Sequence, residues 1–275
     1  MLPRLTKFLR KWILMTIKHS ACLWCYEGFT IEQFCAQGKA IGLDAVDLLT
    51  PKEIEIAAGY GLACPMTTFP VAKLSDGKDV GGIEAAFNRL EHHDALLPLY
   101  DEYLREAKKA GGDNVICFSG NREGLSDLDG LKNCARGISQ LLPLLEELDM
   151  TLTMELLNSR VDHPDYMCDR TQWGVDLCDM IGSDRFRLLY DVYHMQIMEG
   201  DISSTIRSHH QYISHYHTGG CPGRNEIDES QELYYPAIMD AILETGYQGY
   251  VAQEFIPKSD DPIGSLAAAI KVCTR

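Results

Sequence analysis

Acidic and histidine side chains stand at the ends of four successive strand-like segments in the second half of the chain. Glu155, Asp191, His217 and Glu254 close the tripeptides TME, LYD, HYH and AQE, and their separations of 36, 26 and 37 residues are each close to one strand-plus-helix repeat. Converging carboxylates repel one another unless a cation neutralises them. The spacing therefore predicts one divalent metal ion, for which this ligand set suits Mn²⁺, Mg²⁺ or Co²⁺, with Zn²⁺ less favoured because no thiolate contributes.

Two residues near these strand ends are predicted to contact a substrate. His194 lies three residues beyond Asp191, where its ring can hydrogen-bond a hydroxyl or carbonyl oxygen. Arg224 lies on a glycine-rich loop, GGCPGRNE, where a guanidinium can clamp a carboxylate. An ion pair with Glu226 or Asp228 is the alternative for Arg224.

Three further residues have less specific surroundings. Trp24 follows the first strand and is expected to wall the pocket, and Asn158 to contact a substrate oxygen or to support a neighbouring side chain. His215 shares the face of His217 by strand alternation, so we expect it one layer deeper, as a hydrogen-bonded core residue rather than a ligand.

The elements that must position these residues alternate along the chain. Strands are predicted at 19–23, 45–49, 63–67, 114–118, 152–156, 187–190, 213–217 and 250–254, with the clearest helices at 31–41, 99–110, 128–148, 166–181, 236–245 and 262–272. Eight strands separated by helices predict a single (β/α)8 TIM barrel, an α/β fold of roughly 250 residues whose active site lies at the carboxyl ends of its strands. No glycine-rich dinucleotide or phosphate loop supports a doubly wound sheet instead.

The organisation along the chain follows from this pattern. Residues 17–275 are assigned to the barrel and residues 1–16 to an N-terminal extension, expected to form an extra helix because its cations interrupt any signal-peptide or membrane run. The insertion at 70–94 is long enough to fold over the mouth as a lid.

Composition limits the classes of partner. A formal net charge of −15 disfavours nucleic acid and anionic membranes. The ten scattered cysteines are typical of reduced thiols in a cytoplasmic protein, and Cys22 and Cys25 are interpreted as packing residues.

The motifs resemble the xylose-isomerase-like barrel superfamily, in particular sequences grouped with hydroxypyruvate isomerases. The resemblance covers most of the chain from about residue 17 to residue 272. Its densest motifs are MELLN (154–158), YDVYH (190–194), HYHTGG (215–220), PGRNE (222–226), YP (235–236), GYQG (246–249) and QEF (253–255). His217, where hydroxypyruvate isomerases usually carry Gln, and the Glu155-x-x-Asn158 pattern are more similar to ketose 3-epimerases.

The resemblance implies interconversion of hydroxypyruvate and 2-hydroxy-3-oxopropanoate through an enediolate. Glu155 and Glu254 would exchange protons as acid and base, Arg224 would receive the substrate carboxylate, and a homodimer or homotetramer is expected. Three alternatives stay open: a sugar isomerase or ketose 3-epimerase acting on a larger, uncharged substrate, a zinc phosphodiesterase, and a non-catalytic binding barrel.

Overall fold

Parallel strands form the centre of the molecule. The computed structural model describes residues 16–275, so the extension expected over residues 1–16 lies, apart from Thr16, outside the described part. Six strands form one parallel sheet in the order β1-β8-β7-β6-β5-β4. Their bounds are Lys18–Ala21 (β1), Asn114–Cys117 (β4), Thr151–Glu155 (β5), Phe186–Asp191 (β6), Ile213–Thr218 (β7) and Tyr250–Gln253 (β8).

Two extended segments close this sheet into a barrel. Residues 45–49 and 63–67 are joined to each other and to the sheet edges by parallel bridges: Cys22 with Asp47, Ala45 with Ala63, Leu49 with Thr67, and Thr67 with Val115. Leu48 has a φ of 58°, in the left-handed region, which interrupts regular pairing. The predicted eight-stranded barrel is therefore confirmed, with its second and third strands reduced to bridged segments.

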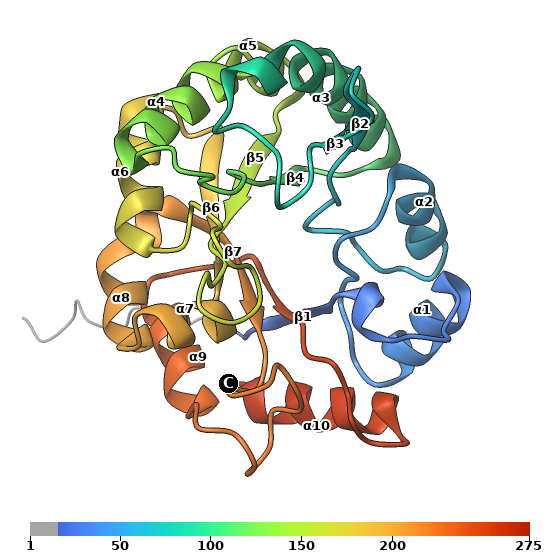
Figure 1. Ribbon diagram of the computed structural model, residues 1–275. Coiled ribbons are helices and arrows are strands. Elements are labelled where there is room, and N and C mark those ends of the chain that lie inside the picture. Colours follow the sequence, from blue (N-terminus) through green and yellow to red (C-terminus); the bar gives the residue numbers. More distant parts are fainter. Residues whose placement is uncertain (1–15) are drawn as a thin grey trace, which may run out of the picture.

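Helices surround the barrel, and Figure 1 shows them as a ring around the central strands. Their bounds are Ile31–Ala40 (α1), Pro51–Gly59 (α2), Leu90–Ala110 (α3), Asp127–Ile138 (α4), Leu142–Leu148 (α5), Thr171–Ile181 (α6), Val192–Met198 (α7), Ile202–His209 (α8), Tyr235–Glu244 (α9) and Pro262–Cys273 (α10). Short 3₁₀ helices occupy Leu23–Cys25 (η1) and His210–Tyr212 (η2).

Several helix boundaries differ from those predicted. α3 begins at Leu90 instead of residue 99, because its buried positions His93, Leu96 and Tyr100 keep helical spacing through Pro98. The predicted helix at 128–148 is divided into α4 and α5, and Pro143 lies in the first turn of α5, where proline is tolerated.

α6 also begins later than predicted. Residues 166–170 form a loop instead, in which Tyr166 pairs with Asn121 and the backbone N–H of Met167 donates to the carbonyl of Gly120. These loop contacts engage backbone groups that would otherwise form the hydrogen bonds of a longer helix.

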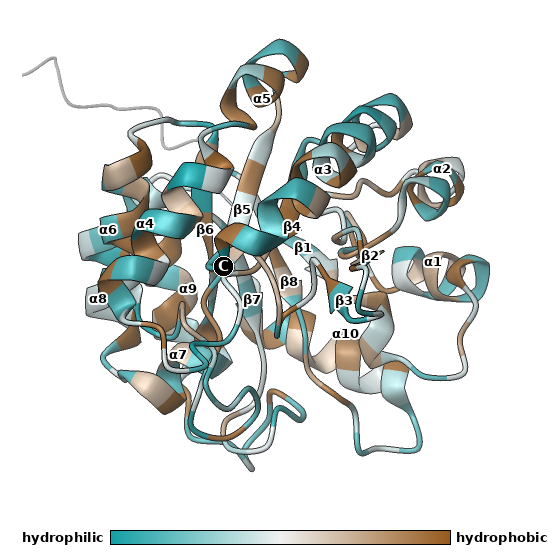
Figure 2. Cartoon of the chain, turned by 45° about the horizontal axis from the view of Figure 1, so that its top comes forward, coloured by the Kyte–Doolittle hydropathy of each residue, from teal (hydrophilic) through white to brown (hydrophobic). Residues whose placement is uncertain are grey.

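The core lies between the barrel and the helix ring. α3 and α4 carry both hydrophilic and hydrophobic residues, as Figure 2 shows, and most of their buried residues are apolar. All ten cysteines are buried and free of disulfide bonds, as expected. Among residues 16–275, no helix is long and apolar enough to cross a membrane.

The insertion at 70–94 folds as a small hairpin followed by a turn into α3. Strand β2 (Ala72–Lys73) pairs antiparallel with β3 (Asp79–Val80). Ile83, just after the hairpin, lines the cavity described below. The insertion therefore contributes to the wall of that cavity, in keeping with the predicted position over the mouth.

Candidate active site

The four strand-end residues predicted from their spacing lie together. Glu155 ends β5, Asp191 ends β6, His217 lies in β7 and Glu254 directly follows β8. One ligand atom from each lies within 4.8 Å of the other three. Each of the four side chains is at most 5% exposed. The barrel register thus brings three carboxylates and one imidazole into a single buried cluster.

This cluster fits a divalent cation. Three carboxylates face the guanidinium of Arg224 and the imidazole of His217, so even with His217 protonated one negative charge would stay uncompensated if all three were ionised, and two with the neutral imidazole that binds a metal ion. Oε1 of Glu155 is buried without a hydrogen-bond partner among the described residues. Uncompensated buried charge is unfavourable, and coordination of a cation is the usual remedy. The donor set therefore suits a divalent metal ion.

The pKa values of the three carboxyls diverge. Burial raises the pKa of Glu155, and burial also raises the pKa of Asp191 to about 8 although Arg224 opposes the rise. Burial would raise the pKa of Glu254 as well, but the charges of Arg224 and His217 hold it well below its usual range. Without a cation, the cluster therefore favours a proton on Asp191 and an ionised Glu254.

Arg224 contacts two carboxylates of the four-residue cluster rather than Glu226 or Asp228. Its Nη2 lies 2.5 Å from Oε2 of Glu254 and 3.4 Å from Oδ2 of Asp191. Its guanidinium carbon lies 5.1 Å from the centre of the Trp24 ring and 5.6 Å from that of Tyr193. The planar cation therefore lies against two aromatic rings, with its Nη2 at the carboxylates.

The loop after β7 is shaped so that it can present this arginine. The N–H of Gly220 donates to the carbonyl of Asn225 at 2.8 Å, and a Cβ on Gly220 would collide with the carbonyl oxygen of Glu226. The hydroxyl of Tyr235 bonds both the N–H and the carbonyl of Gly219. Arg224 itself has a φ of 57°. Glycine at the close approach and Tyr235 at the base fix the loop.

His194 lies in the first turn of α7 and is completely buried. Oδ1 of Asp191 accepts the backbone N–H of His194 at 3.1 Å and so caps this helix. The ring Nδ1 lies 3.2 Å from the backbone nitrogen of Asn158 and 2.6 Å from its Nδ2. Nε2 has no partner among the described residues and lies 3.8 Å from Oδ2 of Asp191. His194 therefore presents a free nitrogen beside the cluster.

Asn158 stands behind His194. Its Oδ1 accepts the backbone N–H groups of Val161 and Asp162, and its Nδ2 donates to Oδ2 of Asp162 at 2.6 Å. Of the two roles predicted for Asn158, these contacts match support of a neighbouring side chain.

A cavity of about 350 Å³ opens onto the cluster. Glu155, Glu254 and Arg224 line it, whereas Asp191 and His217 are completely buried. Trp24, in η1, also lines it as predicted, and its indole N–H donates to Oε1 of Glu254 at 2.8 Å. The rest of the wall is mainly apolar: Leu48, Thr68, Phe69, Ile83, Ile116, Phe118, Leu157 and His163.

Sequence reasoning missed two residues of this region. His163 lines the cavity, and burial lowers its pKa. Asp47 is completely buried in the 45–49 segment and contacts both His215 and His217. A lone carboxylate within an apolar strand was the available signal for Asp47, since such a group needs partners. His215 is a buried, hydrogen-bonded residue, as predicted.

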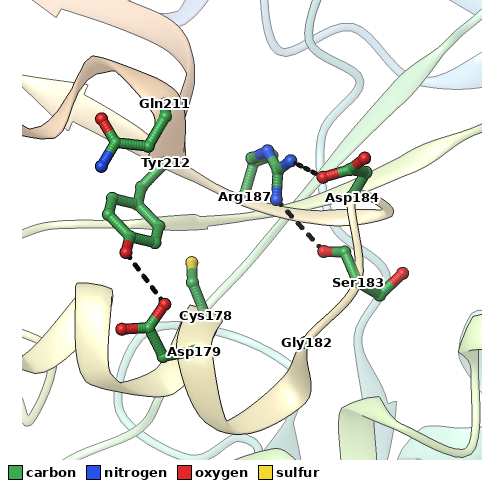
Figure 3. Close-up of a pocket in the computed structure, with 8 residues that line it drawn as sticks. All are labelled: Cys178, Asp179, Gly182, Ser183, Asp184, Arg187, Gln211 and Tyr212. Carbon is green, nitrogen blue, oxygen red and sulfur yellow. Dashed lines mark hydrogen bonds and ion pairs between the residues drawn. The ribbon is translucent and has the colours of Figure 1, made fainter.

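A second cavity, of about 290 Å³, lies where β6 and β7 begin, at the opposite end of the strands (Figure 3). The charged and hydroxyl groups at its centre bond to one another: Arg187 contacts Asp184 and the carbonyl of Ser183, and the hydroxyl of Tyr212 donates to Asp179. This cavity therefore presents no set of free polar groups comparable to that at the carboxyl ends.

Known proteins share this architecture. A crystal structure of AP endonuclease, family 2, from Brucella melitensis superposes with a TM-score of 0.81 and 21% identity, covering 92% of this chain and 97% of that one. Hydroxypyruvate isomerase of Escherichia coli K12 is 26% identical over 58% of this chain, and D-psicose 3-epimerase of Ruminiclostridium cellulolyticum is 27% identical over 46%. The chain spans 62% and 42% of the length of these two relatives. The sequence profile described as xylose isomerase-like TIM barrel matches residues 38–274, and the chain belongs to this family.

Proposed function

We propose that the protein is a metal-dependent isomerase that interconverts hydroxypyruvate and 2-hydroxy-3-oxopropanoate. One observation carries this proposal: of the four clustered side chains, the two glutamates line the cavity while Asp191 and His217 are completely buried. The chain's family and its likeness to the hydroxypyruvate isomerase of E. coli support the reaction type. Glu155, Asp191, His217 and Glu254 would hold the ion.

The two glutamates are suited to move protons. The reaction removes a proton from C3 of hydroxypyruvate, forms an enediolate and returns a proton to C2, while a hydroxyl proton moves between the two oxygens. Glu155 and Glu254 border the cavity from β5 and β8, so one acts as base at one carbon and the other as acid at its neighbour. Their roles exchange in the reverse direction. A bound divalent ion supplies positive charge that acidifies the carbon-bound proton and offsets the charge of the enediolate.

Two more side chains would hold the substrate. Arg224 is kept rigid by Trp24 and Tyr193 and carries donors suited to a carboxylate. The unpartnered Nε2 of His194 would donate to a substrate oxygen, because Nδ1 already accepts the backbone N–H of Asn158. These contacts would place the C2–C3 unit between the glutamates.

A ketose 3-epimerase is the second candidate, and the cavity supplies the observation that favours it. Among the described residues, Arg224 is the one lysine or arginine on the cavity wall, and it already pairs with Glu254. A mainly apolar wall around 350 Å³ leaves room for a substrate larger than a three-carbon acid. The same glutamates would then exchange protons at C3 of the ketose.

A substrate panel separates the two candidates. The Mn²⁺-loaded protein is assayed with hydroxypyruvate and with a set of ketohexoses at equal concentrations. We expect the highest kcat/KM for hydroxypyruvate. A ketohexose that is turned over faster would replace the first candidate with the second, and two or three tightly bound zinc ions per chain would favour a phosphodiesterase instead.

A further inference from the structure

A buried carboxylate contacts the four-residue cluster from the side of His217. Asp47, in the bridged segment 45–49, has both carboxylate oxygens engaged and is completely buried. Oδ1 accepts the hydroxyl of Ser20, and Oδ2 lies 2.5 Å from Nε2 of His215 and 3.3 Å from Nε2 of His217. Three hydrogen-bond donors thus converge on one carboxylate, an arrangement that suits an acceptor.

His217 lies between this carboxylate and the cluster. Its Nδ1 lies 2.9 Å from Oε2 of Glu254 and 3.6 Å from Oε1 of Glu155, while its Nε2 lies against Asp47. A neutral imidazole carries one proton, and the nitrogen without it is the one that binds a metal ion. An acceptor at Nε2 therefore keeps the proton there and leaves the lone pair of Nδ1 facing the two glutamates.

We propose that Asp47 is a positioning residue for the metal site, which fixes the tautomer and ring orientation of His217 so that Nδ1 is available as a ligand. Ser20 and His215 hold the Asp47 carboxylate in place from the other directions. The inference rests on the proposed metal site, and it concerns the affinity of that site rather than the identity of the substrate.

A second ion is the competing explanation for this residue group. Ligand atoms of Asp47, His215 and His217 also lie within 4.8 Å of one another. An ion there would have to displace the donors that now point at Asp47, and it would take both nitrogens of His217. The two explanations differ in stoichiometry: positioning predicts one tightly bound ion per chain, and a second site predicts two.

Mn²⁺ binding to the metal-free protein tests the inference. Isothermal titration calorimetry is carried out on the wild type, on Asp47→Asn and on the control Asp169→Asn. Asp169 is also a buried carboxylate, paired with Arg122 at 3.0 Å, but it makes no contact with the cluster. In Asp47→Asn the introduced amide would offer an N–H to His217 and so favour the proton on Nδ1. We expect Mn²⁺ affinity to fall roughly 10- to 100-fold in Asp47→Asn, the range for loss of a residue that orients a ligand, and to stay within about threefold in Asp169→Asn.

The outcomes separate this inference from the proposed function. A wild type that binds no divalent ion removes the proposed metal site itself. A wild type that binds one ion, with a folded Asp47→Asn variant of unchanged affinity, overturns the positioning role alone. Two ions per wild-type chain would overturn it as well. In a His217→Ala background, Asp47→Asn should weaken Mn²⁺ binding no further, whereas a general structural role would weaken it again.

A measurement on the unmutated protein covers the case in which Asp47→Asn does not fold. Long-range ¹H–¹⁵N correlation spectra of the Mg²⁺-saturated protein report which ring nitrogen of His217 carries the proton. We expect the proton on Nε2. A proton on Nδ1 would contradict the inference.

Discussion

Arg224 lies against Glu254, with Nη2 2.5 Å from Oε2, while the indole N–H of Trp24 donates to the other carboxylate oxygen at 2.8 Å. Glu254 is thereby held in one orientation at the edge of the cavity. This contact joins Arg224, which is predicted to bind the substrate, to Glu254, which is predicted to act as acid or base. On the proposed function, a substitution at Arg224 is therefore expected to affect both substrate binding and proton transfer.

Replacement of Arg224 by lysine should show how much of the activity depends on the planar guanidinium. Lysine keeps the charge but loses the paired donors and the contacts of the planar guanidinium with the rings of Trp24 and Tyr193. Loss of one charge-assisted hydrogen bond, about 1.5–3 kcal/mol, corresponds to a decrease in kcat/KM for hydroxypyruvate of roughly 10- to 100-fold. Steady-state kinetics check this, and an unchanged kcat/KM would contradict a role of the Arg224 guanidinium in binding the substrate.

Metal removal should change how stability depends on pH. The pKa of Asp191 in the folded, metal-free protein, about 8, lies above its ordinary value of 3.8, so the native state binds more protons than the unfolded state between these values. This group therefore lowers the stability of the metal-free protein as the pH rises from about 4 to 8. Metal binding requires deprotonated ligands and strengthens over the same range.

The gap in Tm between Mn²⁺-loaded and EDTA-treated protein should accordingly widen from pH 5.5 to pH 8, because over this range Asp191 of the metal-free native protein still holds a proton that the unfolded state has lost and that metal binding must displace. Differential scanning calorimetry at constant ionic strength measures both forms. In Asp191→Asn the widening should be much reduced. A gap that is constant or narrows with pH in the wild type would argue against a metal site built on this residue.

Asn158 is expected to act through His194. Asn158→Ala removes the side-chain bonds to the loop at 161–162 and the contact with Nδ1 of His194, so we expect a loss of stability of about 1–3 kcal/mol and a lower kcat. The effects of Asn158→Ala and His194→Gln on kcat/KM should be less than additive. Additive effects in the double variant would show that Asn158 acts independently of His194.

The fold and the metal cluster could be predicted because both depend on regular spacing. Repeats of one strand and one helix place Glu155, Asp191, His217 and Glu254 at one end of the barrel, whatever the details of the helices. Helix boundaries depend on competition between local propensity and packing. At Pro98 the buried face of α3 overrode the local signal for a helix start.

The contacts of single side chains were harder to predict. The pairing of Arg224 with Glu254 depends on the path of a loop that contains a cis peptide bond before Pro222 and a left-handed residue at 224. Asp47 lies 170 residues from His217 in sequence, and the closure of the barrel brings the two together. The spacing of residues along the chain does not predict such contacts.

Proton exchange with solvent tests the central claim most directly. The Mn²⁺-loaded protein is incubated with hydroxypyruvate in D₂O, and ¹H and ²H NMR follow deuterium at C3 of hydroxypyruvate and at C2 of 2-hydroxy-3-oxopropanoate. The account predicts incorporation at both carbons by the metal-loaded wild type and none after EDTA treatment. Of Glu155→Gln and Glu254→Gln, the variant that lacks the base at C3 should lose exchange at both carbons, and the other should keep exchange at C3 alone. A metal-loaded wild type that exchanges no carbon-bound proton of hydroxypyruvate, or a Glu155→Gln, Glu254→Gln double variant that exchanges as fast as the wild type, would contradict it.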